Sequence, residues 1–214
     1  MTSYRKITSN IAGKLNLLET YLFYCLALCS DCNTMESYIK QDNLTDFYGI
    51  KKTDQIREWL HKFEFLGLVS IDKFDVYGQY GKFNRCSYQS DTEHYVLITN
   101  KLYDEPISKE LKGFLVLLKC KCLNGTNTTL YSQNKLAEEL GLSKGTISRY
   151  MNEAIENGYV KRNKKGIHLL REDIFLITSE SQLAIIKNLY PEIITDEDLE
   201  SCLLYTSPSP RDCS

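Results

Sequence analysis

An internal duplication constrains the fold of this chain more than any other feature of its sequence. The segment "KITSNI" at 6–11 matches "LITNKL" at 97–102 at an offset of 91 residues. "NLLETYLFYCLALC" at 16–29 follows the pattern of "SKELKGFLVLLKCK" at 108–121 at an offset of 92. Later segments repeat at the same two offsets, and the first copy holds one extra residue in "IKKTDQI" against "LSKGTI". Because chance does not supply several matches in one order, we expect two related domains, at 1–94 and 95–178.

The second copy shows where its elements begin and end. Its helix starts and stops are marked by Ser and Gly residues, which favour the N-caps and C-terminal ends of helices. Ser108 caps a helix with the apolar face Leu111, Phe114, Leu115 and Leu118; Ser132 caps "QNKLAEEL", which stops at Gly141; Ser143 caps "KGTISRYMNEAIEN", which stops at Gly158. The strand-forming "YVKR" and "IHLL" then flank the turn "NKKG". The pattern predicts three helices followed by a β-hairpin, in a chain that is mainly α-helical.

The spacing of the apolar residues identifies the second and third helices as a helix-turn-helix. Counted from Gln133, the positions facing the angle between the helices are Leu136, Ala137, Leu140, Leu142, Ile147 and Tyr150. Ala137 lets the helices cross closely, and Gly141 allows the sharp turn. A generic pair of packed helices is the alternative. The second copy resembles winged helix-turn-helix domains, and more narrowly those of plasmid and phage replication initiators. The resemblance implies two tandem winged-helix domains and double-stranded DNA binding.

The charge of the chain is distributed unevenly, although its formal net charge is only -2. Residues 107–178 hold twelve Lys and Arg against seven Asp and Glu, a net of +5. The segment 179–200 holds one Lys against six acidic residues, a net of -5, and 1–106 carries -2. The second copy is therefore basic where the helix-turn-helix lies, as expected of a DNA-binding domain. A basic face that is only solvated is the alternative.

Helical geometry predicts which residues face DNA. Residues near the start of a helix in the major groove reach base edges, whereas a hairpin meets phosphates. The expected base-reading residues are Lys144, Thr146, Ser148, Arg149 and Asn152, with Arg149 suited to guanine and Asn152 to adenine. The expected phosphate contacts are Lys161, Arg162, Lys164 and Lys165. In the first copy the equivalent face, which is mixed in charge, holds Lys51, Lys52, Gln55, Arg57 and Glu58. That copy either binds DNA weakly or serves a homodimer.

The sequence shows no catalytic or cofactor motif. Cys25, Cys29 and Cys32 have the C-x3-C-x2-C spacing of some iron–sulfur enzymes, but the alternating β and α segments of such enzymes are missing. Two of these cysteines lie one turn apart in an apolar helix, where a free cysteine acts as a small hydrophobic residue. His61, His94 and His168 lack metal-binding spacing. We therefore expect no enzyme, no metal and no cofactor.

The ends of the chain carry two further expectations. "MTSYRKITSN" is no secretory signal and the apolar run Tyr21–Cys29 is too short to cross a bilayer, so we expect a cytoplasmic protein without a membrane segment. The acidic segment 179–201 contains "SQLAIIKNLYPEII", an amphipathic stretch suited to a replication or transcription partner through 181–200. "CLLYTSPSPRD" at 202–212 resembles a translated sequencing adapter, which implies that the tail 202–214 is not native and the protein was interrupted near Ser201. A genuine Ser/Pro tail is the alternative.

The leading hypothesis from the sequence is a sequence-specific double-stranded DNA-binding protein of a phage, plasmid or bacterium. Replication initiation and transcription regulation both stay open. A winged-helix scaffold for protein interactions is the first alternative, and an iron–sulfur protein using the cysteine triad is the second.

Overall fold

A computed structural model of the protein describes residues 3–31, 34–75, 82–87 and 94–177. The elements of the first half are β1 (Tyr4–Thr8), η1 (Ser9–Ile11), α1 (Leu17–Leu28), β2 (Glu36–Ser37), α2 (Gln41–Tyr48), α3 (Thr53–Phe65), β3 (Ser70–Asp75) and β4 (Lys82–Ser87). Those of the second half are β5 (Tyr95–Thr99), α4 (Lys101–Asp104), α5 (Lys109–Cys120), β6 (Thr128–Thr129), α6 (Gln133–Leu140), α7 (Lys144–Glu156), β7 (Val160–Asn163), β8 (Gly166–Leu169) and β9 (Phe175–Leu176).

The elements of the two halves correspond closely in length and position. Helices α1 and α5 have 12 residues each and start 92 residues apart, and α2 and α6 have 8 residues each at the same offset. Helices α3 and α7 have 13 residues each and start 91 residues apart, because the turn before α3 is one residue longer than the turn before α7. The offsets of the sequence repeat are therefore also the offsets of the helices.

The described chain contains more β-sheet than the two hairpins expected of a mainly helical fold, because several short strands add to them. Three antiparallel sheets have the orders β1-β5-β9, β2-β4-β3 and β6-β8-β7. The two-residue strands β2 and β6 add a third strand to each hairpin, and β9 extends the pair β1–β5. The result is a mixed helix-and-strand fold, and the expectation of a mainly α-helical chain holds only in part.

The register of β1 against β5 relates the halves to each other. The two strands start 91 residues apart, and Lys6 pairs with Leu97, its own equivalent in the second half. On either side of this pair, Arg5 faces Ile98 and Ile7 faces Val96. A two-fold rotation about the centre of the Lys6–Leu97 pair produces this pairing.

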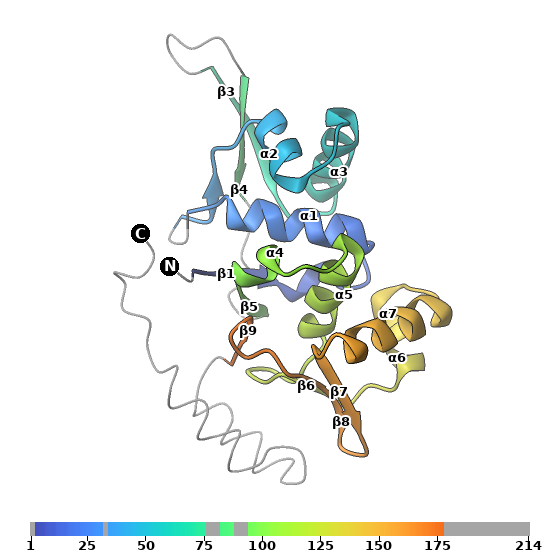
Figure 1. Ribbon diagram of the computed structural model, residues 1–214. Coiled ribbons are helices and arrows are strands. Elements are labelled where there is room, and N and C mark those ends of the chain that lie inside the picture. Colours follow the sequence, from blue (N-terminus) through green and yellow to red (C-terminus); the bar gives the residue numbers. More distant parts are fainter. Residues whose placement is uncertain (1–2, 32–33, 76–81, 88–93, 178–214) are drawn as a thin grey trace.

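Helices α1 and α5 lie at the centre, between α2–α3 at one end and α6–α7 with the hairpin β7–β8 at the other (Figure 1). Asn16 and Glu19 form a reciprocal capping box at the start of α1, and the Ser108 side chain accepts the N–H of Leu111 at the start of α5. Residues 111–120 of α5 are all buried. The expected apolar face of Leu111, Phe114, Leu115 and Leu118 therefore accounts for only part of the buried surface of α5, because α1 covers the opposite side of this helix.

The two central helices approach so closely that only glycine fits at one position. A Cβ on Gly113 of α5 would lie 1.9 Å from the backbone oxygen of Leu17 in α1. Side chains from both halves join in one continuous apolar core around this crossing, including Phe23, Phe63 and Phe114. Described helices are all too short or too polar to span a membrane.

Candidate nucleic-acid interface

Local signals in the sequence define the angle between α6 and α7. The side chain of Ser132 accepts the N–H of Lys135 at the start of α6, and that of Ser143 accepts the N–H of Thr146 at the start of α7. Gly141 ends α6 with a φ of +63°, in the left-handed region that favours glycine. The predicted caps and turn are confirmed, and they direct α7 away from α6 after three residues.

The inner face of α7 packs on the central helix α5. Ile147, Tyr150, Met151 and Ala154 are buried, as the helical spacing predicts. The Tyr150 ring stacks on Phe114 of α5 with 6.0 Å between ring centres. This packing fixes the rotation of α7 about its axis and so decides which of its residues face outward.

The outer face of α7 is polar and exposed. Lys144, Ser148, Arg149 and Asn152 are exposed, whereas Thr146 is half-buried and its hydroxyl lies 2.8 Å from the Ser143 hydroxyl. The Arg149 guanidinium lies 5.1 Å from the centre of the Tyr150 ring, within the range of a cation–π contact. The five expected base-reading residues thus share one side of α7, with Thr146 less accessible than the rest.

The hairpin β7–β8 continues this polar surface. Val160 pairs with Leu169 and Asn163 with Gly166, so the turn consists of Lys164 and Lys165. The Asn163 side chain accepts the backbone N–H of Lys165 (2.7 Å), which stabilises the turn. Lys161, Arg162, Lys164 and Lys165 are all exposed.

The cations of this surface lack anionic partners within the described part of the chain. No carboxylate there forms an ion pair with Lys144, Arg149, Lys161, Arg162, Lys164 or Lys165. By contrast, Lys135 of α6 pairs with Glu138 and Glu139. Helix α7 and its hairpin therefore carry positive charge that other described residues leave uncompensated.

The corresponding face of α3 has a different electrostatic character. Lys51, Lys52, Gln55 and Arg57 are exposed there. Arg57 donates to Asp54 (3.1 Å), and its Nε lies 3.4 Å from the Gln41 side-chain oxygen. Its charge is thus matched within the helix, and the α3 face offers an anion fewer uncommitted donors than the α7 face.

A buried polar network behind the hairpin was not foreseen from the sequence. Lys119 of α5 donates to the backbone oxygens of Thr126 (2.8 Å) and Leu176 (3.0 Å) and to the Asn127 side chain. The side-chain amide of Asn127 in turn donates to the backbone oxygen of Phe175. The backbone oxygen of Asn127 accepts the N–H of Leu169 in β8. These bonds connect α5, β9 and the base of the hairpin. A lysine near the end of a helix and the threonine and asparagine of the loop that follows carry no local signal for such a network.

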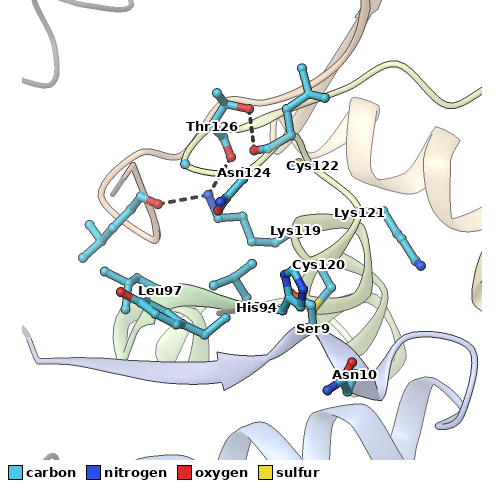
Figure 2. Close-up of a pocket in the computed structure, with 15 residues that line it drawn as sticks. Ser9, Asn10, His94, Leu97, Lys119, Cys120, Lys121, Cys122, Asn124 and Thr126 are labelled. Atoms are coloured by element: carbon cyan, nitrogen blue, oxygen red, sulfur yellow. Dashed lines mark hydrogen bonds between the residues drawn. The ribbon is translucent and has the colours of Figure 1, made fainter. Parts of the chain in front are cut away.

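A pocket of about 340 Å³ lies beside this network, between the two halves of the chain. Ser9, Asn10 and His94 line it from the first half, and Cys120 and Asn124 from the second. Figure 2 shows Lys119 reaching toward Thr126 while Lys121 points away from the pocket. Lys121 pairs instead with Glu139 of α6 at 2.9 Å. Lys119 and Lys121 thus each connect the end of α5 to neighbouring segments of the chain.

The cysteines have the character of packing residues. Burial raises the pKa of the Cys25 thiol to about 12 and that of Cys29 to about 11, so both are protonated near neutral pH. Among the described residues no group of His, Cys, Asp and Glu side chains is arranged to hold a metal ion. Cys32, the third member of the triad, lies outside the described residues.

Comparison with known proteins gives one match that bears on this surface. Residues 131–161 match the family described as winged helix-turn-helix DNA-binding. The chain contains a winged helix-turn-helix DNA-binding domain. The match covers α6, α7 and the first two residues of β7, and it includes Lys144, Arg149 and Lys161 of the six cations that lack an ion-pair partner among the described residues. Neither the curated proteins nor the solved structures include a match to the chain.

Proposed function

We propose that this protein binds double-stranded DNA in a sequence-specific manner, with α7 in the major groove and the hairpin β7–β8 on the phosphate backbone. The observation that carries the proposal is the set of six exposed cations on α7 and its hairpin, which have no anionic partner among the described residues. Phosphates supply the negative charge that such a surface lacks. The match of 131–161 to a DNA-binding family supports the same interpretation.

The residues of this surface have different proposed roles. Arg149 presents two donors to a guanine edge, and Asn152, one turn further along, pairs with an adenine edge. Lys144, Thr146 and Ser148 complete the base-reading set. Lys161, Arg162, Lys164 and Lys165 contact phosphates, which fix the position of α7 without reading sequence.

The proposal includes a tandem arrangement of two winged-helix domains, at 1–94 and 95–178. The equal helix lengths, the offsets of 91 and 92 residues and the symmetric pairing of β1 with β5 support it. The second domain is the DNA reader. The first domain mainly supports the second, because its α3 face offers fewer uncommitted donors to DNA; that face holds Lys51, Lys52, Gln55 and Arg57. A weak second DNA-binding face and a homodimer contact are the alternatives for this domain.

The wider biological role extends the same proposal. The narrow resemblance of the second copy supports replication initiation or transcription regulation in a phage, plasmid or bacterium, with the protein in the cytoplasm. A partner protein would bind through 181–200. No catalytic role and no cofactor are proposed.

A scaffold for protein interactions is the competing function, and one observation favours it. Phe65, the last residue of α3, is 89% exposed, and aromatic residues are enriched at protein–protein interfaces. A scaffold would bind its partner without salt-dependent affinity for DNA.

Selection of DNA sites from a random library, followed by titration at several salt concentrations, tests the proposed function. Arg149→Ala should weaken binding to a selected site by about 1–3 kcal/mol and weaken binding to a scrambled duplex much less. Arg57→Ala, which removes an arginine from the equivalent helix α3, should leave both affinities nearly unchanged. Equal weakening of both duplexes by Arg149→Ala, or the absence of salt-dependent binding, would contradict the assignment and favour the scaffold.

A further inference from the structure

Gly145 occupies an unusual position for a glycine. It is the second residue of α7, and it is exposed. Its backbone is helical and does not have a positive φ. Glycine is the residue least suited to a helix after proline, because the unfolded chain gains entropy from it and the helix gains no side-chain contact. A glycine here lowers the stability of α7.

Neither backbone strain nor packing requires glycine at this position. A Cβ on Gly145 would meet only the hydroxyl oxygen of Ser143, at 3.8 Å, which is an ordinary van der Waals distance. At Gly113 the same Cβ would lie 1.9 Å from a backbone oxygen, and Gly141 has a φ of +63°. The fold therefore explains those two glycines and leaves Gly145 without a structural reason.

The position of Gly145 relative to the DNA face supplies a reason. Ser148, Arg149 and Asn152 follow it by three, four and seven residues, so all four lie on one side of the helix. Gly145 lies at the N-terminal end of that stripe, and the N-terminal residues of a recognition helix are those that contact base edges. The stripe thus carries polar side chains except at the end expected nearest to DNA.

We propose that Gly145 is a DNA-contact position, at which the bare backbone of α7 fits against the DNA surface. This inference rests on the proposed function. A side chain at Gly145 would hold the start of α7 away from the groove and lengthen every base contact made by Arg149 and Asn152. The backbone N–H of Gly145 has no acceptor among the described residues, as is usual in the first turn of a helix.

The test compares thermal stability with DNA binding in single variants of the full chain. Gly145→Ala should raise the melting temperature by about 2 °C, because alanine favours the helix. The same variant should bind a selected duplex about tenfold more weakly. Gly145→Leu, which is also a good helix former, should bind still more weakly. A rise in stability with a loss of affinity excludes misfolding as the cause of the loss.

Asn43→Ala is the matched control, since Asn43 is an exposed residue in the first turn of α2 and alanine raises helix propensity there as well. It should leave the affinity for DNA unchanged. If the wild-type chain binds the duplex and Gly145→Ala binds equally well, the inference is wrong while the proposed function stands. If Gly145→Ala lowers the melting temperature, glycine has a structural role and the inference is wrong. If the wild-type chain itself shows no salt-dependent binding, the proposed function fails first.

Discussion

At the scale of single residues, a network of charges joins the segment 171–173 to the segment 101–105. Arg171 pairs with Asp173 (2.8 Å) and with Glu105 (2.8 Å), and Lys101 pairs with Asp173 (3.2 Å). The hydrogen bond from Arg171 is the main cause that lowers the pKa of Asp173 to about 2, against the opposing effect of burial, and Lys101 adds to it. The carboxylate is thus more acidic in the folded chain than in the unfolded one.

This shift predicts how stability depends on pH. A carboxyl group whose pKa is lowered by folding stabilises the protein above its unfolded pKa of about 3.9, and the stabilisation is lost as the pH falls toward 2. Asp173→Asn should therefore melt below the wild type at pH 7, and the difference should shrink between pH 4 and pH 2. Asp46→Asn, a matched change at an exposed residue of α2, should leave the melting temperature close to that of the wild type at pH 7. A difference for Asp173→Asn that stays constant across this range would contradict the assigned network.

At the scale of elements, the hairpin β7–β8 gives a prediction that separates positioning from reading. Lys164 and Lys165 form its turn, so they reach backbone phosphates and no base edge. Changing both to Ala should weaken selected and scrambled duplexes alike. The slope of log affinity against log salt should become less steep by roughly one to two units, because each lost phosphate contact releases one counterion fewer.

The matched control is the double change Lys51→Ala and Lys52→Ala, which removes two exposed lysines from the turn before α3. It should leave the salt slope nearly unchanged. If the slope responds to Lys51 and Lys52 and not to Lys164 and Lys165, the phosphate-binding hairpin has been assigned to the wrong half of the chain.

The sequence predicts those elements whose signals are local. Ser132, Gly141 and Ser143 each act within a few residues of their own position, so the helix boundaries and the turn of the helix-turn-helix could be read directly. The buried face of α7 followed from its helical period in the same way. Candidate base-reading residues were likewise found as the outward positions of that helix, although their contacts with DNA stay a prediction.

What the sequence does not predict depends on contacts between distant segments. The burial of α5 on all sides results from α1, about 90 residues earlier, and the strand β9 exists because Phe175 pairs with Ile98. The bond from Arg171 to Glu105 joins residues 66 positions apart. No local pattern marks such partners, and the same holds for the three bonds of Lys119.

At the scale of the whole molecule, the helix pairs α2–α3 and α6–α7 are each held by the other half of the chain. A Cβ on Gly13, in the first half, would lie 2.9 Å from the backbone oxygen of Glu139 at the end of α6. In the opposite direction, Lys109 donates to the backbone oxygen of Gly49 (2.6 Å), and Tyr103 stacks on Phe47 with 4.4 Å between ring centres. These contacts and the continuous core restrain rotation between the halves. The position of the α7 surface is therefore fixed by contacts from both halves of the chain.

DNA is proposed to bind this molecule through α7 and the hairpin β7–β8. The most direct test is chemical acetylation of the lysines with and without bound DNA. Mass spectrometry of the modified chain would report the protection of each lysine by a selected duplex. We predict that DNA shields Lys144, Lys161, Lys164 and Lys165, while Lys51 and Lys52 react at the same rate in both samples. Equal reactivity of all these lysines, or protection confined to Lys51 and Lys52, would contradict it.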